Sequence, residues 1–143
     1  IVGRMAWQYA EIEKARELMP FKDDVVWTGY LDVAELAKVT ASAYALVYPS
    51  LFEGFGIPIL EAMTCDVPVI VSNTSSMPEV GGEAALLVDP ASPEDIAAKM
   101  MMIYKDEALR NKMIAAARLR KLDFSWDRSA EQIWDSLMKC VEP

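Results

Sequence analysis

The chain of 143 residues is long enough for one domain with a single hydrophobic core. Its hydrophobic fraction of 53% and charged fraction of 25% are typical of a globular protein rather than a disordered one. The formal net charge of -8 argues against DNA or RNA as the main ligand, because phosphate neutralisation requires a basic face. A bound nucleotide is still compatible with this charge, since backbone amides at a helix N-terminus can hold phosphates.

The sequence contains no histidine, so the commonest general base and metal ligand is missing. Cys65 and Cys140 form neither a zinc pattern nor a disulfide framework, which favours a reducing, cytoplasmic location. No apolar run approaches the ~20 residues needed to span a bilayer, and no signal peptide is visible. The chain opens on Ile1-Val2-Gly3, the pattern of the end of a buried strand, so we expect an upstream segment to be missing.

Helical spacings alternate with short β-rich runs along the whole chain. The first half is predicted to contain a helix over 9–19, a strand over 25–28, a helix over 33–41 capped by Asp32, and a strand over 44–48. The second half is predicted to contain a short helix from Pro58, strands over 67–71 and 85–88, and helices over 92–104, 109–117 and 125–138. This alternation predicts a Rossmann-like α/β fold, a parallel sheet with helices on both faces. Ligands of such folds bind in loops at the carboxyl ends of the strands, which here follow Thr28, Pro49 and Ser72.

One of these loops combines glycines, carboxylates and a helix start. Gly54 and Gly56 allow the backbone to approach a ligand closely and to adopt a positive φ. Pro58 starts the next helix, whose free N–H groups and positive dipole end suit a diphosphate. Glu53 at the mouth of the loop and Glu61, expected on the first helical turn, offer acceptors for sugar hydroxyls. A carboxylate on a first turn is also favourable by about 0.3–1 kcal/mol through the dipole alone, so these residues by themselves leave a ligand role and a structural role equally open.

Glu53 and Glu61, with seven residues between them, resemble the E-x(7)-E motif of the large retaining glycosyltransferase family called group 1. The surroundings resemble that family in the same order, at Thr28-Gly29-Tyr30, Tyr48-Pro49-Ser50, Pro68-Val69-Ile70-Val71-Ser72, Pro78-Glu79-Val80, Leu86-Leu87-Val88-Asp89-Pro90 and Phe124-Ser125-Trp126. The resemblance covers essentially the whole chain. One departure is Cys65-Asp66, where the family usually has Cys-Gly. If that position requires left-handed backbone geometry, Asp tolerates it better than most residues.

The resemblance implies that the chain is the C-terminal half of a two-domain GT-B enzyme. Residues 1–143 would form the nucleotide-sugar (donor) domain, truncated at its N-terminal side, and the acceptor domain would be absent. Glu53 would contact ring hydroxyls of the donor sugar as the catalytic residue, and Glu61 would hold the ribose hydroxyls. The remaining donor-binding residues would be Gly54, Phe55, Gly56 and Ile57 at the sugar and diphosphate, and Thr28, Gly29, Tyr30 and Leu31 near the base.

The implied reaction moves a sugar, from GDP-mannose or a UDP-linked hexose, to a hydroxyl of a glycan or lipid-linked acceptor with retention of configuration. No metal, no other cofactor and no nucleic acid is implied. The full-length enzyme would act in the cytoplasm or at the inner face of the membrane. In this family, a basic pair that clamps the diphosphate lies upstream of the segment resembling Ile1-Val2-Gly3, so we expect this chain alone to bind its donor weakly and not to turn over.

Two hypotheses from other classes are open. A chain of this fold can be a nucleotide-binding or interaction module without catalysis; the presence of both Glu53 and Glu61 argues against this. An epimerase or phosphorylase of the same two-domain shape is the other hypothesis, and the family-wide run of matching segments argues against it.

Several side chains have both a functional and a structural interpretation. Asp23-Asp24 is interpreted as a solvated turn rather than a metal-binding pair. Met100, in a run of three methionines, is expected to face the core. Cys65 is expected to be structural because the chain offers it no histidine partner.

Arg4 and two tryptophans are left with open alternatives. Arg4 is compatible with a phosphate contact and with an exposed charge at a helix start. Trp126 and Trp134 lie eight residues apart on one helical face, where aromatic side chains pack against a core or against an absent neighbouring domain.

Overall fold

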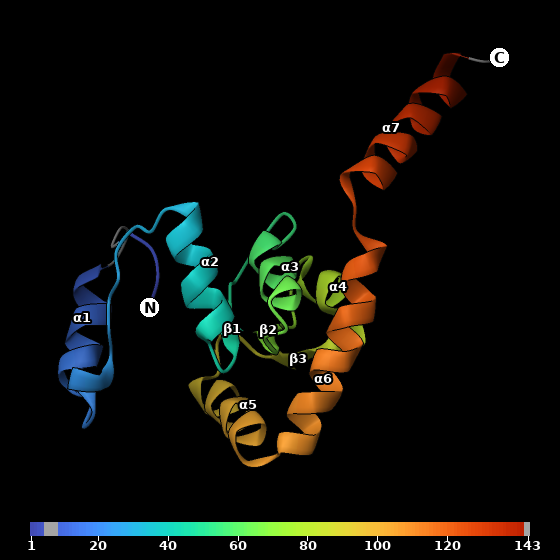
Figure 1. The fold of residues 1–143 in the computed structure, drawn as a ribbon. Coiled ribbons are helices and arrows are strands. Elements are labelled where there is room, and N and C mark those ends of the chain that lie inside the picture. Colours follow the sequence, from blue (N-terminus) through green and yellow to red (C-terminus); the bar gives the residue numbers. More distant parts are fainter. Residues whose placement is uncertain (5–8, 142–143) are drawn as a thin grey trace. The chain divides into compact units, whose positions relative to one another are not determined.

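The computed structural model describes residues 1–4 and 9–141. The chain forms two compact units, Ile1–Val39 and Thr40–Pro143 (Figure 1). Helix α2, Val33–Ser42, contains the division between them.

In the first unit, residues 1–4 and 9–39 contain helices and one β-bridge. It contains α1 (Tyr9–Glu17), the 3₁₀ turn η1 (Lys22–Asp24) and the start of α2. Asp32 caps α2 as predicted, because its Oδ1 accepts from the Glu35 amide at 2.8 Å while Glu35 Oε2 accepts from the Asp32 amide at 3.2 Å. The exposed turn η1 agrees with the interpretation of Asp23-Asp24 as solvated.

The strand predicted over 25–28 is reduced to a single parallel bridge, between Val2 and Gly29. The Thr28 amide donates to the Ile1 carbonyl at 3.0 Å, and the Gly3 amide donates to the Gly29 carbonyl at 2.9 Å. The expectation that Ile1-Val2-Gly3 is a buried strand end is also wrong for this structure, since Ile1 is 60% exposed.

The second unit contains a parallel three-stranded sheet in the order β1-β2-β3. The strands are β1 (Leu46–Tyr48), β2 (Val69–Ser72) and β3 (Ala85–Val88). All of β2 is buried, as expected for the central strand of a sheet covered on both faces. The predicted α/β fold with a parallel sheet is therefore confirmed.

Helices cover both faces of this sheet (Figure 1). They are α3 (Ile57–Thr64), α4 (Met77–Gly81), α5 (Pro93–Lys105) and α6 (Glu107–Arg120), with 3₁₀ turns η2 (Gly82–Ala84) and η3 (Lys121–Asp123). Helix α7 (Trp126–Val141) follows them and has no buried residue. The predicted start of α5 is confirmed, because Ser92 Oγ accepts from the Asp95 amide at 3.2 Å and Pro93 follows it. Among these helices only α4 escaped the sequence analysis, because five residues are too few to show a period.

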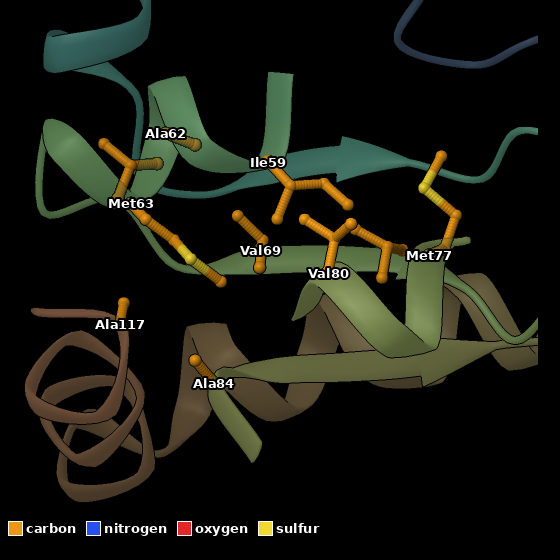
Figure 2. Close-up of a cluster of buried hydrophobic side chains, with 10 residues drawn as sticks. Ile59, Ala62, Met63, Val69, Met77, Val80, Ala84 and Ala117 are labelled. Atoms are coloured by element: carbon orange, nitrogen blue, oxygen red, sulfur yellow. The ribbon is translucent and has the colours of Figure 1, made fainter. Parts of the chain in front are cut away.

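Alternation along the strands divides the core into two clusters. Residues of β1 and β2 that point to one face pack with α3, α4 and α6; Figure 2 shows Ile59 and Met63 of α3 near Val69 of β2. On the other face, Ile70 packs with Ile103 of α5. Strand β2 contributes to both clusters, so the start of the loop that leaves its carboxyl end is anchored on both faces of the sheet.

Three expectations about side chains need correction or refinement. Met100 is 48% exposed rather than buried, because Ile103 is the side chain through which α5 reaches the core. Packing of Trp126 and Trp134 into the core is also wrong, since they are 85% and 64% exposed. Cys65 is half-buried against the core cluster, as a structural thiol would be.

None of the helices within residues 9–141 is both long and apolar enough to cross a bilayer.

Candidate functional site

Two loops leave the carboxyl ends of neighbouring strands and contact each other. The loop over 49–56 connects β1 to α3, and the loop over 73–76 connects β2 to α4. Because β1 and β2 are parallel and adjacent, both loops emerge at the same edge of the sheet.

The start of α3 has an unusual backbone. Gly56 is the residue before the helix and has a φ of 99°, which L side chains rarely adopt. A Cβ at this position would lie 3.1 Å from both Ile59 Cδ1 and Met77 Sδ. Glycine is therefore required here both for its backbone angle, as the sequence led us to expect, and for the close packing of α3 against α4, which the sequence did not indicate.

Four consecutive backbone amides at this point have no acceptor. Within residues 1–4 and 9–141, the amides of Gly54, Phe55, Gly56 and Ile57 donate no hydrogen bond. The first amides of any helix lack intrahelical partners, and here the unpaired run extends back through the glycine loop. Consecutive free N–H groups at the positive end of a helix form an anion site.

The Glu53 carboxylate is held at one of its two oxygens. The Tyr48 hydroxyl donates to Glu53 Oε1 at 2.5 Å, and the Ser50 hydroxyl lies 3.0 Å from the same oxygen. In the described part of the chain nothing donates to Oε2. Burial of the Tyr48 hydroxyl and its hydrogen bond to the Glu53 carboxylate raise the pKa of Tyr48 to about 12. The Tyr48 hydroxyl therefore stays protonated around neutral pH and donates a hydrogen bond to Glu53.

The loop after β2 fixes the backbone on either side of Glu53. Ser75 Oγ accepts from the Glu53 amide at 3.2 Å, and Ser76 Oγ lies 3.0 Å from the carbonyl oxygens of both Glu53 and Phe55. Thr74 Oγ1 donates to the Leu51 carbonyl at 3.1 Å. Ser75 itself has a φ of 51°, a strained angle for a residue that is not glycine.

Glu61 lies on α3 but one turn later than expected. With Gly56 at the cap, Glu61 is the fifth helical residue, so it stands in the second turn rather than the first. The expectation counted from Pro58 and so misplaced the turn. The Glu61 side chain is exposed and makes no hydrogen bond or ion pair with the described residues. It is available to a ligand.

The segment predicted to lie near the base belongs to the first unit. Thr28 is exposed, with its hydroxyl 3.2 Å from the Gly29 carbonyl, and Gly29 has a φ of 69°. Tyr30 is exposed beneath the Arg4 guanidinium, which lies 5.1 Å from the ring centroid, and Leu31 is half-buried. This aromatic contact gives Arg4 a local partner within the first unit.

An apolar hollow of about 500 Å³ adjoins the glycine loop. Phe55 forms one wall and contacts Phe124 edge to face at 5.7 Å between ring centroids. Ile57, Leu60 and Trp126 line the rest, together with Ser125 and Ser129. In the described part of the chain, no group of three or more cysteine or acidic side chains is placed to hold a metal ion.

The structure thus brings Glu53, the free amides of 54–57 and Glu61 together on one loop and its helix. Sequence reasoning missed the hydroxyl groups that hold this loop, from Tyr48, Ser50, Ser75 and Ser76. A usable signal was present: hydroxyl residues end β1 and follow β2, and parallel neighbours bring such positions to the same edge.

The fold of the chain is that of GT-B glycosyltransferases. Sucrose-phosphate synthase from Thermosynechococcus elongatus superimposes with a TM-score of 0.82 at 27% identity, over 97% of this chain and 38% of that one. Anabaena Alr3699/HepE, solved in complex with UDP-glucose, gives a TM-score of 0.84 at 20% identity, over 96% of this chain and 40% of that one.

The sequence comparisons define the family. The model of the family described as "Glycosyl transferases group 1" matches residues 1–120. O-antigen chain mannosyltransferase B of Escherichia coli is 37% identical over 126 residues, which cover 78% of this chain and 33% of that protein. MMP alpha-(1->4)-mannosyltransferase of Mycolicibacterium hassiacum is 35% identical over 76% of this chain and 28% of its own length. The chain therefore belongs to the group 1 glycosyltransferase family, and it spans about a third of the length of these relatives.

Proposed function

We propose that this chain is the donor-binding domain of a retaining hexosyltransferase, and that its donor is a nucleoside diphosphate sugar. The observation that carries the proposal is the run of unpaired amides over 54–57, because such a run at a helix start suits a diphosphate. Membership of the group 1 family supports the same class of reaction.

Each carboxylate in the site has its own role in this proposal. Glu53 accepts hydrogen bonds from ring hydroxyls of the sugar, because one of its oxygens has no partner in the described chain. Glu61 accepts from the ribose hydroxyls of the nucleotide, for which its exposed position on α3 leaves room. The residues Thr28, Gly29, Tyr30 and Leu31 contact the base. On this proposal the reaction uses no metal, because the free amides and a basic clamp upstream of this chain hold the diphosphate together.

We propose mannose as the sugar and GDP-mannose as the first donor to test. The support is the naming of several relatives at 32–37% identity as mannosyltransferases. A UDP-linked hexose is the second donor to test. The acceptor is a hydroxyl of a glycan or a lipid-linked glycan, in line with the O-antigen relatives, and polysaccharide biosynthesis is the setting.

We propose further that the acceptor site lies in an N-terminal domain of the same enzyme, that the basic diphosphate clamp lies upstream of the segment Ile1-Val2-Gly3, and that the enzyme acts in the cytoplasm or at the inner face of the membrane. The short span of this chain relative to its relatives supports that division. On this proposal the chain alone binds its donor weakly and transfers nothing.

Calorimetric titration of the chain with GDP, UDP, GDP-mannose and UDP-glucose tests the proposal. We expect saturable binding with one base preferred, and a loss of about 10- to 100-fold in Glu61→Gln, the value of a hydrogen bond to a charged group. The matched control is Glu83→Gln, which alters an exposed glutamate outside the site and leaves the affinity unchanged.

Equal affinities of the chain and Glu61→Gln would contradict the ribose assignment. If the chain binds nothing, the titration is repeated on the complete protein, where continued failure to bind would contradict the transferase hypothesis. Binding by the complete protein without transfer to any acceptor would favour a non-catalytic module instead.

A further inference from the structure

The Tyr48 side chain is fixed more firmly than the carboxylate that it contacts. Tyr48 is the last residue of β1, paired in register with Val71 of β2. Its half-buried ring packs against the core cluster beneath α3. The hydroxyl therefore projects from a rigid strand end, while Glu53 lies on an irregular loop.

Tyr48 and Ser50 do not hold Glu53 equally. The Ser50 hydroxyl lies 3.0 Å from Glu53 Oε1 and 3.2 Å from the Phe52 carbonyl oxygen, so its single hydrogen is shared between two acceptors. The Tyr48 hydroxyl has Glu53 Oε1, at 2.5 Å, as its one acceptor among the described residues. Of the two hydroxyls, that of Tyr48 is the one that donates its hydrogen bond to Glu53 alone.

We propose that Tyr48 is a positioning residue that fixes Glu53 Oε1 and so directs Oε2 toward a hydroxyl of the donor sugar. The inference rests on the proposed role of Glu53. Tyr48 acts through the carboxylate and does not touch the substrate. Rotation of the carboxylate would break the bonds at Oε1, so the loss of rotational freedom is incurred when the chain folds rather than when the donor binds.

The test is a double-mutant cycle on transfer by the complete protein that contains this chain. Tyr48→Phe keeps the ring and removes only the hydroxyl. We expect it to lower kcat/KM for the donor about tenfold, as one hydrogen bond to a charged group implies. In a Glu53→Ala background the same change is expected to have no further effect, because the group through which Tyr48 acts is gone.

The control variant is Tyr44→Phe. The Tyr44 hydroxyl also donates to a carboxylate, Glu107 Oε2 at 3.1 Å, but at an exposed position away from the loops over 49–56 and 73–76. It should transfer at the rate of the unmodified protein. Thermal unfolding is measured for each variant. Replacing Tyr48 by 4-aminophenylalanine restores an N–H donor on the same ring and should restore transfer.

The outcomes separate this inference from the proposed function. Unchanged transfer in Glu53→Ala would overturn the proposed role of Glu53 itself. A loss in Glu53→Ala without a loss in Tyr48→Phe would overturn only the inference. Equal losses from Tyr48→Phe in both backgrounds would also overturn it, since Tyr48 would then act independently of Glu53. If Tyr48→Phe does not fold, Tyr48 is replaced by 4-fluorophenylalanine, which fills the space of the hydroxyl without donating a hydrogen bond; the same loss is expected, and unchanged transfer there would overturn the inference.

Discussion

The carboxylate of Asp66 forms a two-pronged ion pair with the guanidinium of Arg118. Arg118 Nε donates to Oδ1 at 2.9 Å, and Nη2 donates to Oδ2 at 2.8 Å. Asp66 has a φ of 58°, so it holds the left-handed angle for which the family usually has glycine. The Val67 amide bonds to the Ala62 carbonyl at 2.9 Å and the Asp66 amide bonds to Met63 at 3.2 Å, which is the Schellman ending of α3. The ion pair from α6 accompanies a backbone angle that a side chain rarely adopts.

This relationship predicts the order of stability of three variants. Asp66→Gly removes the ion pair but relieves the backbone angle, and Arg118→Ala removes the pair alone. Asp66→Ala removes the pair and keeps the strain, so it should have the lowest melting temperature of the three. Thermal unfolding at neutral pH measures the order. An Asp66→Ala protein as stable as Asp66→Gly would contradict the account.

The same pair predicts a dependence on acid. The hydrogen bonds from the Arg118 guanidinium hold the pKa of the Asp66 carboxyl below its usual value. A lowered folded-state pKa gives stability that is present above the unfolded value and lost as the pH falls through the folded value. The difference in unfolding free energy between the unmodified chain and Arg118→Ala should therefore shrink on acidification below about pH 4. Denaturant unfolding at several pH values measures it, and a constant difference would show that the pair contributes nothing.

Local chemistry made part of this fold predictable. Asp32 and Ser92 correctly indicated two helix starts, because a capping side chain bonds to an amide only three residues away. The positive φ of Gly56 was predictable because glycine adopts this angle most readily. The strand over 25–28 and the burial of Met100 were not, because they depend on what else is available to pair or pack with.

The hydrogen bonds that hold the Glu53 loop were not predictable from the sequence for the same reason, because they depend on tertiary contacts. Tyr48 and Glu53 are five residues apart, but the contact depends on how the chain turns after β1. The hydroxyls of Ser75 and Ser76 reach Glu53 from more than twenty residues away. Such contacts arise from the pairing of β1 with β2, which periodicity alone does not specify.

The two glycines of the loop should respond differently to alanine. A Cβ on Gly56 would meet Ile59 and Met77 at 3.1 Å and would sit on a backbone with a φ of 99°. We expect Gly56→Ala to destabilise the chain by about 2 kcal/mol, through strain and overpacking together.

Gly54→Ala is the matched comparison. A Cβ on Gly54 would meet nothing within 4 Å, so the stability should stay within about 0.5 kcal/mol of the original. If a nucleotide sugar approaches this backbone closely, the same variant should bind it more weakly. Denaturant unfolding and calorimetry measure the two effects. Equal stability of both variants would contradict the packing argument, and undiminished affinity in Gly54→Ala would contradict close approach.

The hydroxyl of Tyr48 should make the folded chain lose stability in alkali. Its pKa is raised to about 12 by burial and by the hydrogen bond to Glu53. A raised folded-state pKa means that the stabilisation is complete below the unfolded value near 10 and is lost as the pH rises toward 12. The unmodified chain should lose more stability between pH 10 and 12 than Tyr48→Phe does. Denaturant unfolding across this range measures the difference, and parallel pH profiles would show that the hydroxyl is not held in this way.

The Arg120 side chain holds the C-terminal end of α4. Its Nε donates to the Val80 carbonyl at 3.2 Å, and its Nη2 donates to the Glu79 carbonyl. These carbonyls belong to the last turn of a five-residue helix, which cannot pair them internally. The guanidinium also pairs with Asp123 at 2.8 Å and lies 4.7 Å from the Phe124 ring centroid. One side chain thus fixes α4, whose first residue follows the serines that hold the loop of Glu53.

We therefore expect Arg120→Ala to lower the unfolding free energy by about 2–3 kcal/mol, because charge-assisted hydrogen bonds to two otherwise unpaired carbonyls are lost together. Arg120→Lys keeps the charge without the planar fork and should recover less than half of that loss. Urea unfolding of both variants measures the effect, with Lys121→Ala on the adjacent 3₁₀ turn as the control. Because α4 begins beside the serines that contact Glu53, Arg120→Ala should also weaken donor binding in proportion. Lost stability with unchanged donor affinity would show that the loop keeps its shape without α4.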